Sequence, residues 1–278
     1  MTGFSADWLT LREPVDHRSR NRELTSQLAA RFAARDDITV IDIGCGTGSN
    51  LRGTAPMLAT RQQWTLVDYD PALLLAARHQ LAAWAETSFA DGETLVLERA
   101  GKTIRVGFRQ ADLAADLDAA LGQGADIITA AAFFDLASPA FIRRFADAVA
   151  VRRAVFYTVL TYNGIQRWQP RSPADNAMAA AFHRHQMTDK GLGAAAGPTA
   201  PQELADAFAC QESYSVIEGD SPWVLGSDDQ ALIAELQAGH AQAVSETRAV
   251  DAATIAAWVK LVRTGSTVGH TDTLAVPA

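Results

Sequence analysis

The sequence predicts an α/β fold, in which helices pack on both faces of a mostly parallel sheet. Short apolar segments suited to strands are followed by helical patterns along the first half of the chain. A glycine-rich turn at 44–48 follows the first of these segments, and Asp68 ends the second. Folds of this kind bind ligands at the carboxyl ends of their strands. With 278 residues, 48% of them hydrophobic, the chain can bury one full core, so we expect a single domain over 1–278.

The first apolar segment leads into the most informative stretch of the chain, VIDIGCGTGSN at 40–50. Its acidic, glycine and amide positions are Asp42, Gly44, Gly46, Gly48 and Asn50. Glycines at this spacing let the backbone turn sharply and approach a ligand that a Cβ would obstruct. Dinucleotide sites use G-x-G-x-x-G/A, but the third position of that pattern falls on Ser49. The observed pattern is D-x-G-x-G-x-G, and Pro56 predicts that the helix after it is short or kinked.

The second strand is expected at 64–67 and ends at Asp68, which is placed to accept hydrogen bonds from both hydroxyls of a ribose. Asp70 and Pro71 then predict the N-cap and the first residue of a helix. The remaining strands and hairpin arms are expected at 94–99, 103–110, 126–132, 151–160, 214–219 and 266–277.

With Asp112 at the end of the third strand, these features resemble the class I S-adenosylmethionine-dependent methyltransferases over about 38–160. The resemblance implies a doubly wound, Rossmann-like seven-stranded sheet of order 3-2-1-4-5-7-6, with strand seven antiparallel. It implies S-adenosylmethionine as the cofactor, S-adenosylhomocysteine as the product, and methyl transfer by in-line displacement. Asp68 would then bind the ribose and Asp112 the adenine amino group. The residues that it assigns to the cofactor are Asp42, Gly44, Gly46, Gly48, Asn50, Asp68, Tyr69, Asp112, Leu113, Thr129 and Ala130.

The N-terminal segment 1–35 is expected to form a helical lid over the cofactor, with a turn through WLTLREP and a helix from about Asp16. Many small-molecule methyltransferases of this class have such a lid. An arginine in it can bind the methionine carboxylate, because a guanidinium and a carboxylate form two parallel hydrogen bonds. Arg12 is favoured because it precedes the helix, and the alternative is that Arg12, Arg18 and Arg20 are all solvated.

Two helical insertions depart from the minimal fold, at 165–200 after the fifth strand and at 221–265 after the sixth. The first contains a helix from roughly 173 to 190, and the second contains two helices. Insertions at this end of a sheet build substrate pockets, so we expect these two to cap the acceptor.

Histidines of the first insertion are candidate catalytic residues. His183 and His185 point about 200° apart on a helix, so they cannot share an ion, and we expect no metal. His185 and Asp189 stand four apart on one face, where the carboxylate could orient the imidazole as a base. The alternative is a helix-end His185 beside a solvated Asp189, and His183 competes as the imidazole that faces the pocket.

Two further candidates follow strands four and five. Asp135, in the sequence FFDLAS, would lie beside the sulfonium of the cofactor, or alternatively brace the following turn. Tyr162 closes the fifth strand and could orient a polar group of the acceptor. A base is needed only if the acceptor is protonated, as a phenol, an alcohol or an amine is.

The composition and charge of the chain limit the classes of partner that we expect it to bind. The net charge is −8 and no basic cluster is present, which disfavours a nucleic-acid substrate and favours a small-molecule acceptor. No apolar signal region and no apolar run of membrane length occur, so we expect a cytoplasmic protein that does not bind membranes. The sequence does not indicate an oligomeric state. Two other functions remain as alternatives to a methyltransferase. One is an NAD-dependent oxidoreductase, which would share Asp68, and the other is a cofactor-binding protein without methyl transfer.

Overall fold

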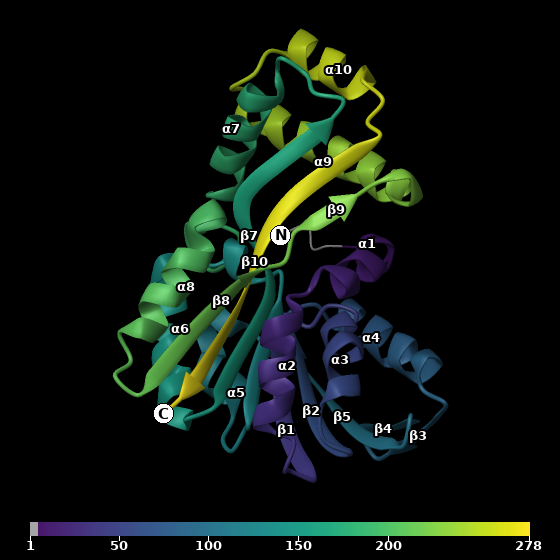
Figure 1. Ribbon diagram of the computed structural model, residues 1–278, viewed down its shortest axis with the longest axis vertical. Coiled ribbons are helices and arrows are strands. Elements are labelled where there is room, and N and C mark those ends of the chain that lie inside the picture. Colours follow the sequence, from purple (N-terminus) through teal and green to yellow (C-terminus); the bar gives the residue numbers. More distant parts are fainter. Residues whose placement is uncertain (1–4) are drawn as a thin grey trace.

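The computed structural model describes residues 5–278 and places them in a twisted sheet with helices on both faces (Figure 1). Residues 1–4, which belong to the predicted lid at 1–35, lie outside the described residues. The sheet has ten strands in the order β3-β4-β5-β2-β1-β6-β7-β10-β8, with β9 paired to β10. The strands are β1 (Asp37–Ile43), β2 (Arg61–Asp68), β3 (Thr87–Asp91), β4 (Thr94–Arg99), β5 (Lys102–Gln110), β6 (Ile127–Ala131), β7 (Val155–Gln169), β8 (Tyr214–Asp220), β9 (Trp223–Leu225) and β10 (Gly265–Pro277).

The predicted strand order is confirmed. Strands β5, β2, β1, β6, β7, β10 and β8 take the places of strands three, two, one, four, five, seven and six, and β10 runs antiparallel to β7. The predicted count of seven strands was too low, because β4 and β3 extend one edge and β9 adds a short arm to β10. The predicted hairpin is formed by β4 and β5.

Helices connect and flank these strands. They are α1 (Ala6–Ser19), α2 (Arg22–Arg31), α3 (Ser49–Thr54), α4 (Pro71–Trp84), α5 (Leu113–Leu121), α6 (Pro139–Arg152), α7 (Asp175–Gln186), α8 (Ala200–Ala209), α9 (Gln230–Thr247) and α10 (Ala252–Lys260). Several begin at a residue whose side chain accepts a hydrogen bond from the first turn, as an N-cap does. Asp70 caps α4 as predicted, with its Oδ1 2.8 Å from the amide nitrogen of Ala72.

The predicted helix start near Asp16 was wrong. Helix α1 begins after Ser5, whose hydroxyl accepts a hydrogen bond from the amide of Trp8, and it continues through Pro14 to Ser19. A proline inside a helix removes one backbone hydrogen bond, which is why the sequence indicated a turn there. Side-chain contacts of α1 with the glycine loop and α3, described below, offset this loss. The short helix predicted before Pro56 is confirmed, since α3 ends at Thr54.

Two hydrophobic clusters lie on opposite faces of the sheet and hold its central strands. Along β1, Val40 packs into the cluster shared with α2 and α4, while Ile41 and Ile43 pack into the cluster shared with α5, α6 and α8. Alternate residues of a strand point to opposite faces, so both faces of β1 are covered. This packing fixes the carboxyl end of β1, where the glycine loop begins.

Strands β7 and β10 continue beyond the rest of the sheet as a long antiparallel ribbon, to which α7, α9 and α10 attach (Figure 1). The predicted fifth strand, 151–160, therefore ended too early. An irregularity at Leu160, whose φ is +60°, interrupts the pairing, and Asp272 accepts a hydrogen bond from the amide of Leu160 at 2.8 Å. The strand then resumes, so Tyr162 lies on β7 opposite His270 of β10.

Candidate functional site

The glycine loop between β1 and α3 needs glycine at its alternate positions. Gly44, Gly46 and Gly48 have φ values of +59°, +53° and +78°, which residues other than glycine rarely adopt. A Cβ on Gly44 would lie 2.5 Å from Cδ2 of Phe133, and one on Gly46 would lie 2.9 Å from Cδ1 of Leu9. The turn after β6 and helix α1 therefore both pack directly on the loop.

Asp68, at the carboxyl end of β2, is tied to the same loop. Its Oδ2 accepts a hydrogen bond from the amide of Gly46 at 2.8 Å, and its Oδ1 accepts one from the amide of Asp70 at 3.0 Å. Burial raises the pKa of Asp68, and these two bonds oppose the rise. Each carboxylate oxygen keeps a further lone pair for a ligand. The neighbouring ring of Tyr69 is 61% exposed, so it is free to contact one.

Asp42 and Asn50 belong to a buried polar network beneath the loop. The side-chain amide of Asn50 donates to Asp42 at 2.8 Å and to the hydroxyl of Thr129 at 3.0 Å. Nη2 of Arg20 donates to the side-chain Oδ1 of Asn50 at 3.1 Å. Burial raises the pKa of Asp42 to about 7, and its Oδ2 has no hydrogen-bond partner within residues 5–278. The network joins β1, β6, α3 and the end of the predicted lid.

The residues assigned to the adenine end lie at the edge of the sheet. Asp112 is exposed and caps α5 by accepting a hydrogen bond from the amide of Ala114 at 2.9 Å. Leu113 is buried beside it, and Ala130 is buried on β6. Asp112 follows β5 and Ala130 lies on β6, with β2 and β1 between these two strands, and Asp112 is accessible to a ligand.

Helix α1 lies across the glycine loop and α3, where the sequence predicted a lid. Besides the contact of Leu9 with Gly46, Glu13 forms an ion pair with the buried side chain of Arg52. Nε2 of His17 lies 3.0 Å from the carbonyl oxygen of Ser49. These contacts place α1 directly over the loop.

Arg12 of α1 faces the second insertion. Its guanidinium donates to Asp16 from Nε at 2.9 Å and from Nη2 at 3.2 Å, and it lies over the ring of Trp223 at 4.9 Å. The indole nitrogen of Trp223 also donates to Asp16, at 3.0 Å. Arg12 is therefore held by α1 and β9 together, and its Nη1 has no hydrogen-bond partner within residues 5–278.

Tyr162 and His183 meet where the ribbon leaves the sheet. The hydroxyl of Tyr162 lies 3.0 Å from Nε2 of His183. Burial raises the pKa of Tyr162, and the charge of Asp135 adds to this rise. Burial lowers the pKa of His183, so the ring favours its neutral form. The pair forms a hydrogen-bonded unit between β7 and α7.

Asp135 lies in the 3₁₀ turn Phe134–Leu136 after β6, two residues from the ring that covers Gly44. Its Oδ1 is shielded from solvent and has no hydrogen-bond partner within residues 5–278. Burial raises the pKa of Asp135 to about 6, although the charge of Arg12 opposes the rise. Asp135 thus lies near Tyr162, which in turn contacts His183.

His185 does not meet Asp189 as predicted. Helix α7 ends at Gln186, so the four-residue helical spacing does not reach Asp189. Oδ1 of Asp189 accepts hydrogen bonds from the amides of Gly191 and Gly193 at 2.7 and 3.1 Å. Nε2 of His185 lies instead 2.9 Å from the exposed carboxylate of Glu246 on α9.

His270 of β10 also lies beside Tyr162. It is 6% exposed, and its ring centroid lies 6.3 Å from that of Tyr162 and 5.1 Å from that of Trp223. Burial and the charge of Arg12 lower the pKa of His270 to about 3, and Nδ1 has no partner within residues 5–278. Its register opposite Tyr162 is a signal that appears only once β7 and β10 are paired.

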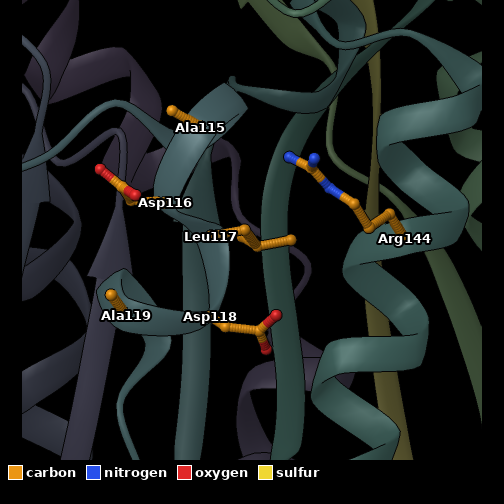
Figure 2. A pocket seen from close by; sticks show the side chains of 6 residues that line it. All are labelled: Ala115, Asp116, Leu117, Asp118, Ala119 and Arg144. Carbon is orange, nitrogen blue, oxygen red and sulfur yellow. The ribbon is translucent and has the colours of Figure 1, made fainter.

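Other features lie apart from this site. A surface hollow of about 290 Å³ lies between α5 and α6 (Figure 2). It is lined by Ala115, Asp116, Leu117, Asp118, Ala119 and Arg144. Across residues 5–278, no cluster of three or more histidine, cysteine or carboxylate side chains is arranged to bind a metal ion. Over the same residues, no helix has the length and apolar character needed to cross a bilayer.

Comparison with known proteins identifies the fold. No family model matches the chain, and no curated protein sequence matches it. Among solved structures, the YcgJ protein from Bacillus subtilis matches with a TM-score of 0.50 and 12% identity, over 92% of this chain and 99% of that one. A SAM-dependent methyltransferase from Thiobacillus denitrificans, in complex with S-adenosyl-L-homocysteine, gives a TM-score of 0.45 and 15% identity, over 98% of this chain and 99% of that one. The likeness to the YcgJ protein concerns the fold alone.

Proposed function

We propose that the chain binds S-adenosylmethionine at the glycine loop and transfers its methyl group to a small-molecule acceptor held beneath the two insertions. One observation carries the proposal: the glycine loop with Asp68 and the cluster of Asp135, Tyr162 and His183 lie at the same edge of the sheet. Phe133 connects them, because its ring packs on Gly44 and its chain leads into the turn of Asp135. A cofactor site and a site with groups for acid-base chemistry are thus adjacent.

The residues at the loop fit an adenosyl cofactor. The loop makes a tight turn that requires glycine, since Gly44 and Gly46 have positive φ and leave no room for a Cβ against Phe133 and Leu9. Asp68 can accept the ribose hydroxyls, Asp112 can accept the adenine amino group, and the exposed Tyr69 can contact the base. When bound, S-adenosylmethionine supplies an electrophilic methyl group on a sulfonium. The pattern D-x-G-x-G-x-G and the absence of a glycine at Ser49 support this cofactor over NAD.

The chain's own residues orient the acceptor and exclude water. Displacement at a methyl carbon depends mainly on holding the nucleophile in line with the bond that breaks. Helix α1 covers the loop through Leu9, and Arg12 joins this helix to the cap through Trp223. We assign α1 to the lid and the segments 165–200 and 221–265 to the acceptor cap on the basis of these contacts.

Tyr162 and His183 can take a proton from the acceptor. When the Tyr162 hydroxyl donates to Nε2 of His183, the phenolic oxygen keeps its lone pairs for an N–H or O–H group of the acceptor. A proton passed to Tyr162 can move on to His183 as the tyrosine gives up its own. Because the pKa of Tyr162 is raised, the tyrosine transfers a proton without resting as a phenolate.

The proposal is tested by measuring transfer of a tritiated methyl group from S-adenosylmethionine to a panel of small amines, phenols, alcohols and carboxylic acids. We expect a labelled product with at least one acceptor, formed together with S-adenosylhomocysteine. Binding of S-adenosylhomocysteine without methyl transfer to any acceptor class would favour the alternative of a cofactor-binding protein.

A further inference from the structure

In the cluster of Asp135, Tyr162 and His183, the negative charge of Asp135 is not neutralised by an ion pair. Its Oδ1 has no hydrogen-bond partner, and it forms no ion pair with residues 5–278. The positive charge of Arg12 lowers the pKa of Asp135, but the guanidinium of Arg12 is bound to Asp16 through two hydrogen bonds. A shielded carboxylate oxygen without a partner is unfavourable, so Oδ1 of Asp135 favours a ligand of opposite charge.

The other polar groups around Asp135 are neutral near pH 7. Burial lowers the pKa of His270 to about 3 and lowers that of His183, while the pKa of Tyr162 is raised. Arg12 and Asp16 cancel each other's charge. The charge that remains on this side of the site is therefore the negative charge of Asp135.

Aromatic rings lie beside this carboxylate. Phe133 precedes it by two residues, and Tyr162 lies close enough for the charge of Asp135 to raise its pKa. The faces of Tyr and Trp rings attract cations, and Trp223 already binds the guanidinium of Arg12 in this way. One unmatched carboxylate next to aromatic rings is a chemistry suited to an ammonium group.

We propose that the acceptor is a small primary or secondary amine, whose nitrogen is bound by Asp135 next to the Tyr162–His183 pair. This inference rests on the proposed function and names its substrate class. A neutral alcohol or an anionic acceptor would leave the charge of Asp135 unmatched, whereas an ammonium group matches it. Asp135 then acts as the counter-ion and stays ionised.

Methyl transfer to the amine needs no proton acceptor besides Tyr162 and His183. The bound ammonium loses one proton to the oxygen of Tyr162, and Tyr162 passes its hydroxyl proton to Nε2 of His183. The lone pair of the nitrogen then forms the new C–N bond as the C–S bond breaks, and the electrons of that bond go to sulfur. The products are the methylated ammonium ion and S-adenosylhomocysteine, and half-buried His183 returns its proton to solvent.

The test is isothermal titration calorimetry on the protein saturated with S-adenosylhomocysteine. The probes are methylamine, cyclohexylamine, benzylamine and 2-phenylethylamine, each compared with the alcohol of the same shape and with benzoate. We expect at least one amine to bind about tenfold more tightly than its alcohol, and Asp135→Asn to remove that preference. Asp135→Glu should retain it, because the charge is kept.

Asp147→Asn is the matched control, because it removes one exposed carboxylate on α6 and should leave amine binding unchanged. Thermal unfolding and S-adenosylhomocysteine binding of each variant show whether it is folded. The inference is overturned if alcohols or benzoate bind as tightly as amines, if no amine binds, or if Asp135→Asn leaves the amine preference intact. Failure of the wild type to bind S-adenosylhomocysteine would instead overturn the proposed function, so the two failures are distinguishable.

Discussion

The hydroxyl of Tyr162 lies 3.0 Å from Nε2 of His183, and this contact joins the long strand β7 to helix α7 of the first insertion. The sequence predicted Tyr162 at the end of the fifth strand and His183 in an insertion that caps the acceptor, but no local pattern paired the two side chains. The contact sets a buried phenol and a half-buried imidazole beside Asp135, at the sheet edge that carries the glycine loop.

Removal of either member of the Tyr162–His183 pair should slow turnover. We expect Tyr162→Phe and His183→Asn each to lower kcat roughly 100-fold, as loss of a positioned proton acceptor does. The double variant should be no slower than the slower single one, because the two side chains act as one unit. Calorimetric affinity for S-adenosylhomocysteine should stay unchanged in all three. A large loss of kcat with His185→Asn, and none with His183→Asn, would contradict the assignment.

Asp68 should act on the ribose as well as on the loop. We expect Asp68→Asn to weaken S-adenosylhomocysteine binding about tenfold, because one carboxylate acceptor is lost. The 2′-deoxy analogue of this ligand should lose much less affinity in the same variant, since it lacks the hydroxyl that the carboxylate binds. Asp70→Asn, which removes a neighbouring charge and keeps both carboxylate oxygens of Asp68, is the control. Equal losses for both ligands would mean that Asp68 only braces the amide of Gly46.

Gly44 should resist substitution for two separable reasons. Gly44→Ala should destabilise the protein by about 2–4 kcal/mol, from its φ of +59° and the contact with Phe133. Gly92 has a φ of +60° with nothing within 4 Å of a Cβ, so Gly92→Ala measures the backbone part alone. In the Gly44→Ala background, Phe133→Ala should restore only the part of the lost stability that comes from the steric contact. Urea unfolding of Gly44→Ala, Gly92→Ala, Phe133→Ala and the double variant checks this. Equal losses of stability for Gly44→Ala and Gly92→Ala would refute the packing of Phe133 on the loop.

Asp42 should make stability depend on pH. Its folded pKa of about 7 is above its ordinary value of 3.8, so the folded state binds the proton more tightly than the unfolded state. Its stabilising contribution is present below about pH 4 and is lost as the pH rises through 7. Relative to Asp42→Asn, the wild-type free energy of unfolding should therefore fall across this window, by at most about 1.4 kcal/mol per pH unit. A difference that is constant from pH 4 to 7 would show that Asp42 titrates normally.

The first half of the chain could be predicted closely because its signals are local. Glycines with positive φ, the Asp70–Pro71 cap and the hairpin at β4 and β5 each depend on a few adjacent residues. Strand β3 was missed because all five of its residues are exposed and carry no apolar alternation. Tertiary contacts also overrode local signals in α1, where Pro14 indicated a turn.

The acceptor side could be predicted only in part, because it depends on contacts between distant segments. The fifth strand was expected to end at residue 160, yet β7 continues to Gln169 because residues 265–271 of β10 pair with it. The same pairing brings His270 opposite Tyr162, and it is invisible to any local pattern. The contact of His185 with Asp189 was wrong for the opposite reason, since a helical spacing was extended past the end of α7.

We propose that the glycine loop and Asp68 bind S-adenosylmethionine and not NAD. The most direct measurement is isothermal titration calorimetry with S-adenosylmethionine, S-adenosylhomocysteine and NAD in parallel. We predict micromolar binding of both sulfur-containing ligands and no measurable binding of NAD. Binding of NAD without binding of the other two would contradict the account and assign the loop to an oxidoreductase.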